Sequence, residues 1–251
     1  MGTFVVLRAA SSVRTLVLPA SWRSDEVALW PADLDEWDWN GQEPGALLST
    51  DERARAARFV FEKDRRRFVT GRAVLRTLLG RSLGRPAAGL SFRYGTQGKP
   101  MLADRDLWFN VSAAAGKALY AVSPGRRVGV DIERIRDIAE MEAVAERAFS
   151  MTEKDWLRAR PAARRRSAFF RCWTRKEAVV KGLGAGFSMP PDRFDVGPGR
   201  SGLVRVTVAS PGEIGHWIVR DIAAFPGYAA AAAAEAPGVR QEALSVIEER
   251  A

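Results

Sequence analysis

Cysteine and histidine are almost missing from this sequence, and each shortage argues against a class of chemistry. The chain has one cysteine, Cys172, so no disulfide can form within it, which suits a reducing cytoplasm. Cys172 lies in a helical pattern beside Trp173, where a small buried thiol is more typical of core filling than of a nucleophile. The one histidine, His216, lies in a strand-like run with no nucleophile elbow nearby, which argues against a serine hydrolase.

Long apolar runs are also absent, and no stretch is long enough to cross a membrane as a helix. The short run from Phe4 to Leu7 is followed by Arg8, a pattern that does not predict a signal peptide. We therefore expect a cytoplasmic protein that does not bind membranes. Residues 1–24 are either an N-terminal extension or an added strand, and the sequence does not decide between them.

Basic charge, in contrast, is abundant in an otherwise ordinary globular composition. The chain has 251 residues and a formal net charge of +9. This length permits two packed halves of roughly 100–150 residues each. The charge favours acidic partners, which include nucleic acid, phosphorylated cofactors and acidic proteins, without choosing among them.

The first half of the sequence predicts one strand, a basic helix and three more strands. Ser49 and Thr50 precede Asp51 and Glu52, the capping hydroxyls and first-turn acids that start a helix. Hydrophobic periodicity predicts this helix over 51–82 and strands over 26–37 (ending in a turn), 90–94, 107–112 and 118–123.

The second half repeats this mixture of helices and strands. The patterns predict helices over 139–148, 152–160 (with Thr152 as the cap), 163–182 and 240–250, and strands over 128–135, 203–208, 216–222 and 228–233. We expect an α+β protein with two similar halves joined near Pro124–Arg127. The expected divisions are 1–24 as the extension, 25–125 and 126–235 as the two halves, and 236–251 as a tail or short helix.

Acidic residues occupy one face of the strand VGVDIE. Because strand side chains alternate, Asp131 and Glu133 project together with Gly129, away from the apolar set. Two neighbouring carboxylates repel each other unless solvent, a base or a cation intervenes. The alternative is an ordinary polar face at a strand end.

A third carboxylate lies on the apolar face of the helix over 163–182. At roughly 100° per residue, Glu177 lies about 40° from Trp173 and shares a sector with Val180. A buried charge needs a partner, and Lys181 could supply an ordinary i,i+4 ion pair. Alternatively, three carboxylates from two elements suit one hard cation such as Mg²⁺, with positions left for water and substrate phosphates.

At these residues the sequence resembles the two signature motifs of the 4′-phosphopantetheinyl transferases. The matching segments are GVDIE at 129–133 and WTRKEAVVKGLGAGF at 173–187, supported by YGTQGKP at 94–100 and FNVS at 109–112. The similarity covers roughly 26–235 and is greatest to the larger, pseudo-dimeric (surfactin-synthetase-activating) class, which acts on carrier domains of nonribosomal peptide and polyketide synthases. The paired motifs are specific, whereas GVDIE alone would be weak.

The resemblance implies two similar α+β halves packed as a pseudo-twofold dimer within one chain, with the site in the cleft between them. It implies a Mg²⁺-dependent enzyme, with Mn²⁺ as an alternative. The reaction would move the 4′-phosphopantetheine group of coenzyme A onto a serine of an apo acyl or peptidyl carrier protein and release adenosine 3′,5′-bisphosphate. We expect a monomer, because two fused halves already build one complete cleft.

The resemblance also assigns roles to single residues. The matching metal ligands are Asp131, Glu133 and Glu177. Glu177 further matches the base of the serine hydroxyl, or the residue that orients it, so the implied catalytic residues are Glu177, Lys181 and Asp131. The positions that match cofactor contacts are Arg55, Arg67, Lys99, Ser112 and Lys181. Cations at these positions would pair with the phosphates of coenzyme A. The plainer alternatives are a solvated helix face for each arginine and a turn residue for Lys99.

One position departs from the family. The usual Ser-His after FNV is Ser112-Ala113 here, so a phosphate donor is missing. A charge-assisted hydrogen bond is worth about 1.5–3 kcal/mol, so cofactor binding or rate should be weaker unless another cation compensates. The alternative function is a non-catalytic or weakly active paralogue that binds coenzyme A or a carrier protein.

A nucleic-acid binder is the other alternative, but the chain lacks the aromatic strand pattern of RNA platforms and any zinc-finger spacing. We expect no nucleic-acid partner. For the carrier protein, Met151, Trp156 and other apolar residues between 139 and 160 are a hypothetical docking surface, with ordinary core packing as the alternative.

Overall fold

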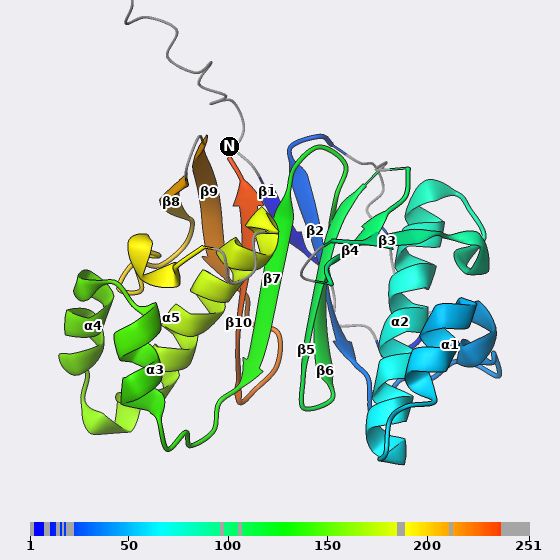
Figure 1. Ribbon diagram of the computed structural model, residues 1–251, viewed down its shortest axis with the longest axis horizontal. Coiled ribbons are helices and arrows are strands. Elements are labelled where there is room, and N and C mark those ends of the chain that lie inside the picture. Colours follow the sequence, from blue (N-terminus) through cyan, green and yellow to red (C-terminus); the bar gives the residue numbers. More distant parts are fainter. Residues whose placement is uncertain are drawn as a thin grey trace, which may run out of the picture.

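The computed structural model shows two four-stranded sheets packed face to face, with helices covering both outer faces (Figure 1). It describes residues 3–7, 11–13, 16, 18, 23–95, 98–104, 107–184, 189–210 and 213–236. The layers therefore run helix, sheet, sheet, helix, and the predicted α+β fold of two similar halves is confirmed. Among the described residues, no helix is long and apolar enough to cross a membrane.

The first sheet has the strand order β1-β2-β6-β5. Its strands are β1 (Thr3–Val6), β2 (Glu26–Asp33), β5 (Trp108–Ala114) and β6 (Lys117–Ser123). Helices α1 (Thr50–Ala56) and α2 (Glu62–Leu83) belong to this half, and a small hairpin of β3 (Phe92–Tyr94) and β4 (Pro100–Leu102) lies beside them. Strand β1 pairs parallel to β2, so the N-terminal segment contributes an added strand.

The second sheet has the strand order β7-β10-β9-β8. Its strands are β7 (Val128–Arg134), β8 (Val204–Ser210), β9 (Glu213–Asp221) and β10 (Tyr228–Glu235). Helices α3 (Met141–Ala148), α4 (Met151–Arg158) and α5 (Ala162–Leu183) lie on its outer side (Figure 1). Strand β7 is an edge strand of this sheet, as β5 is of the first.

The two halves repeat one plan. The antiparallel order β2-β6-β5 in the first half corresponds to β7-β10-β9 in the second. The long helices α2 and α5 each have 22 residues and each ends at a left-handed glycine, Gly84 and Gly184. Only glycine adopts this conformation at little cost, so the same signal ends both helices.

A buried ion pair also recurs at equivalent places. Glu52 belongs to the capping box of α1 and pairs with Arg76 of α2 at 2.6 Å. Glu153 belongs to the capping box of α4 and pairs with Lys176 of α5 at 2.7 Å. In each half, therefore, one buried carboxylate both starts a short helix and anchors it to the long one, which supports an internal duplication that the sequence alone did not reveal.

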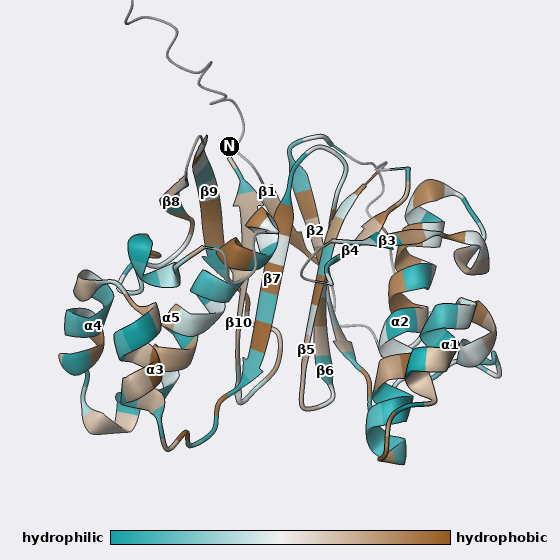
Figure 2. Ribbon diagram, viewed as in Figure 1, coloured by the Kyte–Doolittle hydropathy of each residue, from teal (hydrophilic) through white to brown (hydrophobic). Residues whose placement is uncertain are grey.

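Three apolar clusters fill the layers. One lies between the first sheet and α2, one lies between the second sheet and its helices, and the third lies between the two sheets. The third includes Leu29 of β2, Leu119 of β6 and Val130 of β7, all fully buried. Figure 2 shows hydrophobic residues on the strands and hydrophilic residues on the outward helix faces.

Some predicted boundaries are wrong. The helix expected over 51–82 is two helices, because the chain leaves α-helical geometry after Ala56 and re-enters it at Glu62. Thr152 lies inside α4, and Ser150 is its cap. Strand β4 was not predicted. The helix expected over 240–250 lies outside the described residues.

Candidate active site

The predicted acidic face of β7 is present and lies under α5. The apolar set on the opposite face belongs to the core between the sheets: Val128, Val130 and Ile132. A Cβ atom placed on Gly129 would lie 2.0 Å from the main-chain oxygen of Ala178 in α5. Because Asp131 shares the face of Gly129, the alternation turns this carboxylate toward the helix that carries Glu177 and Lys181.

Asp131 is the buried centre of the cluster. Its side chain is 2% exposed, and its Oδ1 accepts hydrogen bonds from Ser112 Oγ at 2.9 Å and Lys181 Nζ at 2.5 Å. Its Oδ2 is buried and has no hydrogen-bond partner among the residues that the structure describes. A buried charge is costly unless it is paired, so one oxygen is compensated while the other is left with unused capacity.

Two side chains of β5 accept hydrogen bonds from the main-chain N–H groups at the outer edge of β7. The main-chain N–H of Val130 donates to Asn110 Oδ1 at 2.9 Å, and that of Ile132 donates to Ser112 Oγ at 3.4 Å. These strands belong to different sheets, so side chains here replace a backbone ladder. The cluster therefore forms where the two halves meet.

The Ser112 hydroxyl uses its full hydrogen-bonding capacity inside this junction. It donates to Asp131, accepts from the N–H of Ile132 and accepts from Lys181 Nζ at 3.0 Å. A hydroxyl has one donor and two acceptor sites. In this arrangement Ser112 orients Asp131 and Lys181, and its predicted cofactor contact stays a prediction.

Two glycines bring α5 close enough to β7 for these contacts. A Cβ on Gly129 would also lie 2.4 Å from the main-chain nitrogen of Gly182, and a Cβ on Gly182 would lie 2.4 Å from the ring of Trp217. Real side chains do not tolerate such distances. The glycines of the two sequence motifs therefore allow α5 to pack at a short distance from β7, and at this distance Lys181 reaches Asp131.

Two further carboxylates surround Asp131. Burial, followed by the negative charge of Asp131, raises the pKa of Glu177 above its usual range, while Lys181 opposes this. Burial and then Asp131 likewise raise the pKa of Glu133. Lys181 forms its ion pair with Asp131 rather than with Glu177, so the simple i,i+4 pair considered from the sequence is not the one formed.

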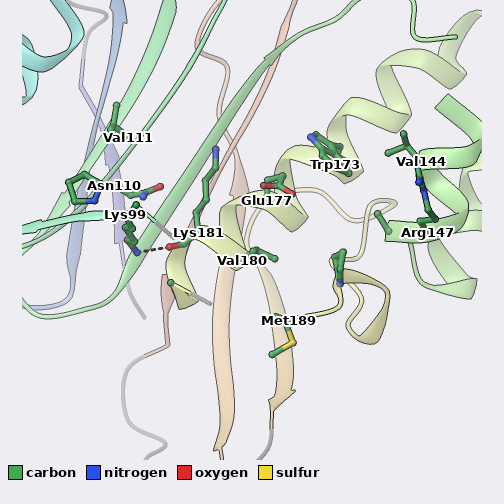
Figure 3. Close-up of a pocket in the computed structure, with 15 residues that line it drawn as sticks. Lys99, Asn110, Val111, Val144, Arg147, Trp173, Glu177, Val180, Lys181 and Met189 are labelled. Atoms are coloured by element: carbon green, nitrogen blue, oxygen red, sulfur yellow. Dashed lines mark hydrogen bonds between the residues drawn. The ribbon is translucent and has the colours of Figure 1, made fainter. Parts of the chain in front are cut away.

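A cavity of about 750 Å³ opens beside the cluster (Figure 3). One face of α5 forms a wall, with Trp173, Glu177, Val180 and Lys181 at helical spacing and the cap residue Gly184 at its end. Val144 and Arg147 of α3 and Met189 lie across from β5 in Figure 3. The lining therefore combines apolar side chains with charged ones from both sides, Lys99 and Lys181 on one side and Arg147 on the other.

Lys99 joins the two halves at this cavity. Its ammonium donates to the main-chain oxygens of Lys181 at 2.5 Å and Gly182 at 3.4 Å, at the C-terminal end of α5 (Figure 3). Burial, with a smaller contribution from Arg127, lowers the pKa of Lys99 to about 8. A cation is favourable at a helix C-terminus, so Lys99 stabilises the end of α5 while lining the cavity.

The two predicted arginines lie away from this cavity. Arg55 is exposed, with its guanidinium 5.2 Å from the centre of the Phe68 ring. Arg67 forms a two-point ion pair with Asp35 at 2.7 and 2.6 Å. Neither lines the cavity beside Asp131, so their cofactor role stays a prediction. Ala113 is exposed next to Ser112 on β5.

Sequence reasoning missed Asn110 as a site residue. It lies two positions before Ser112 on the same strand, so the alternation within FNVS places both side chains on one face. The two-residue spacing between Asn110 and Ser112 could therefore have identified Asn110 as a site residue. What the spacing could not show is that this face meets the edge of β7.

The donors around Asp131 are of the kind that a hard divalent cation takes. Carboxylate oxygens suit Mg²⁺, and Asp131 Oδ2 has no partner among the described residues. Burial, followed by the negative charge of Asp131, raises the pKa values of Glu133 and Glu177. Within the described part of the chain, however, no three His, Cys, Asp or Glu side chains are already gathered closely enough to hold an ion. The residues therefore fit a cation in type and charge.

Comparisons with known proteins agree on one family. Residues 127–233 match the model of the 4′-phosphopantetheinyl transferase superfamily, and residues 30–124 match that of the N-terminal part of 4′-phosphopantetheinyl transferases. The chain is 43% identical to the 4′-phosphopantetheinyl transferase HetI of Nostoc over 169 residues, which is 66% of this chain and 71% of that protein.

Two more distant relatives have similar names. The chain is 27% identical to the 4′-phosphopantetheinyl transferase Sfp of Bacillus subtilis over 202 residues, 80% of this chain and 88% of that protein. It is 30% identical to the L-aminoadipate-semialdehyde dehydrogenase-phosphopantetheinyl transferase of Mus musculus over 167 residues, 60% of this chain and 53% of that protein.

Proposed function

The chain belongs to the 4′-phosphopantetheinyl transferase superfamily, and from this we propose that the cluster around Asp131 is the site at which it transfers the phosphopantetheine group of coenzyme A to a serine of an apo carrier protein. The observation that carries the proposal is the buried carboxylate of Asp131, held by Ser112 and Lys181 with one oxygen unpartnered. A site built to receive a cation and phosphates explains this otherwise costly arrangement.

We assign the metal to Asp131, Glu133 and Glu177, with Mg²⁺ as the expected ion and Mn²⁺ as the alternative. When bound, the cation supplies neutralisation of the negative charge on the diphosphate. The protein's own side chains stabilise the leaving phosphate and accept the serine proton. Lys181 lies close enough to Asp131 to place its ammonium beside the same phosphates, where it stabilises the leaving phosphate.

Glu177 is the proposed proton acceptor. Its carboxylate lines the cavity one helical turn before Lys181, which places a proton acceptor beside the proposed phosphate position. The serine oxygen of the carrier forms a bond to the β-phosphorus of coenzyme A, and the serine proton passes to Glu177. The phosphorus–oxygen bond to the nucleotide breaks, which releases adenosine 3′,5′-bisphosphate.

The division of the chain follows from the same proposal. We place the first half at 25–125 and the second at 126–235, each contributing one wall of the site through β5 and β7. Because one chain supplies both walls, we propose that the enzyme acts as a monomer.

The test is transfer itself. We expect the purified protein, with coenzyme A, Mg²⁺ and an apo peptidyl carrier domain, to add the mass of one phosphopantetheine group to the carrier, read by intact mass spectrometry. The gain should vanish with a chelator and with Glu177→Ala. Coenzyme A binding without mass gain on any of several carriers would contradict transfer and favour the non-catalytic alternative.

Ala113 motivates that alternative and gives a separate prediction. Ala113→His is expected to tighten coenzyme A binding by about 10- to 150-fold, since a charge-assisted hydrogen bond is worth about 1.5–3 kcal/mol. Titration calorimetry measures this, with 3′-dephospho-coenzyme A to show whether the 3′-phosphate is the partner. Ala163→His, on the exposed first turn of α5, is the control. Equal affinity in the wild type and Ala113→His would show that another cation already fills this place.

A further inference from the structure

A fully buried ion pair lies between α4 and α5. Lys176 of α5 is 1% exposed, and its ammonium lies 2.7 Å from a carboxylate oxygen of Glu153 in α4. The ammonium also donates to the main-chain oxygens of Pro191 at 2.6 Å and Phe194 at 2.7 Å. An ammonium has three N–H donors, so these three partners use its full capacity. Lys176 therefore ties α5 both to α4 and to the segment that runs from Pro191 to Phe194.

This segment belongs to one wall of the cavity. It contains the one-turn 3₁₀ helix η4 (Pro191–Arg193), and Pro191 lines the cavity together with Met189, which lies across from β5 in Figure 3. Glu153 holds the same segment a second time, because its other carboxylate oxygen accepts the N–H of Val196 at 2.8 Å. The position of this wall is thus set by a buried carboxylate and a buried ammonium that lie behind it.

The first half contains the same arrangement at the equivalent place. Arg76 of α2 pairs with Glu52 of α1 at 2.6 Å. Its guanidinium also donates to the main-chain oxygens of Ala87 at 3.1 Å and Leu90 at 2.9 Å. In both halves the two carbonyls belong to the first residue of a one-turn 3₁₀ helix, η2 (Ala87–Gly89) or η4, and to the residue that follows it. The described residues that line the cavity include none from the η2 segment. The internal duplication thus places one copy at the cavity and one copy away from it.

The lining of the cavity suits the uncharged part of coenzyme A. Lys181, which is proposed to lie beside the phosphates, lines the cavity together with the apolar side chains of Val144, Val180 and Met189. The pantetheine arm begins at the β-phosphate and carries no charge of its own. It is therefore the part of coenzyme A that these apolar side chains can cover while the phosphates stay beside Lys181.

We propose that Lys176 is a positioning residue for the pantetheine arm: through the carbonyls of Pro191 and Phe194 it fixes the wall of the cavity against which the arm packs. The inference rests on the proposed function. Lysine suits this role because its three donors share one compact ammonium, whereas the guanidinium of arginine is longer and planar. Lys176 is fully buried and protein interiors are closely packed, so a guanidinium fits there only if Pro191 and Phe194 move away from α5.

The test exchanges the cations between the halves, with Lys176→Arg and Arg76→Lys as separate variants. Calorimetry in Mg²⁺ measures the affinity of each variant and of the wild type for coenzyme A and for adenosine 3′,5′-bisphosphate, which is coenzyme A without the phosphopantetheine group. We expect Lys176→Arg to weaken coenzyme A binding about tenfold, because the wall is displaced, and to leave bisphosphate binding unchanged. Arg76→Lys should leave the ratio of the two affinities as in the wild type. Chemical denaturation checks that both variants are folded.

Two results would overturn the inference. One is an unchanged affinity ratio in Lys176→Arg. The other is an equal fall of the ratio in Arg76→Lys, which would assign the effect to a general loss of stability. If Lys176→Arg does not fold, Glu153→Asp and its first-half counterpart Glu52→Asp decide in the same way, because the shorter carboxylate draws the ammonium back from the wall.

The binding measurements need no turnover, so they separate this inference from the proposed function. A wild type that binds coenzyme A but modifies no carrier contradicts the proposed function, and the affinity ratio then still decides the role of Lys176. A wild type that does not bind coenzyme A overturns both.

Discussion

Replacing Asp131 with asparagine is expected to lower kcat for phosphopantetheine transfer about a thousandfold, equivalent to about 4 kcal/mol of transition-state stabilisation. Asparagine keeps the shape and can still accept the hydrogen bond from Ser112. It removes the charge that holds Lys181 at 2.5 Å and the oxygen that has no protein partner. The two groups proposed to neutralise the negative charge of the phosphates, the cation and the Lys181 ammonium, are therefore lost together.

The measurement is the rate of carrier modification at saturating coenzyme A, alongside the KM for each substrate. Asp221→Asn is the control, because Asp221 also pairs with cations, Arg171 and Arg175, yet does not line the cavity. Its kcat should match the wild type. A fall of only a few-fold in Asp131→Asn would mean that the reaction centre lies elsewhere.

Replacing Gly182 with alanine is expected to lower the free energy of unfolding by about 1–3 kcal/mol. Alanine normally stabilises a helix relative to glycine. A loss of stability in Gly182→Ala would therefore have to come from the packing around the added carbon. Here the added carbon would meet the ring of Trp217 at 2.4 Å, and this ring is fully buried. Either Trp217 or α5 must move, and a shift of α5 also carries Lys181 away from Asp131.

Chemical denaturation measures the stability change, and Gly71→Ala is the matched control. Gly71 lies inside α2, where a Cβ would meet only ordinary contacts, at 3.6 Å to Tyr120 Oη and 3.7 Å to Leu34. That variant should be as stable as the wild type or more stable by up to about 1 kcal/mol. If Gly182→Ala were as stable as Gly71→Ala, the close packing of α5 on β7 would not be a constraint.

Local patterns predicted the elements that carry the site. Alternation gave β7 and helical periodicity gave α5, both within two residues of the observed bounds. Helical periodicity placed Glu177 on the inward face of its helix, and strand alternation placed Asp131 on the face opposite the apolar set of β7. Pairing between elements was not predictable from the sequence. Lys181 pairs with Asp131 rather than with Glu177 because Gly129 and Gly182 allow α5 to pack close to β7.

Long-range contacts account for the other differences. The partners of Ser112 belong to β7 and α5, and only the packing of the two halves brings them to it, so its motif alone could not predict them. Its cofactor role stays a prediction. The helix break at residues 57–61 lacked a proline or glycine signal. It depends on Phe59 folding back onto Phe68, and the first-turn acids Glu62 and Asp64 were the only local hint of a new helix start.

The covered edge of β7 has a consequence for why both halves share one chain. Val130 and Ile132 rely on acceptors that the other half supplies, so a separate second half would present an unpaired, largely apolar edge open to self-association. As separate chains, the halves would have to find each other at cellular concentrations. The short tether at residues 124–127 instead fixes their effective concentration at about the millimolar level or above, whatever the expression level. Fusion thus makes assembly of the proposed active site independent of the cellular concentration of the protein.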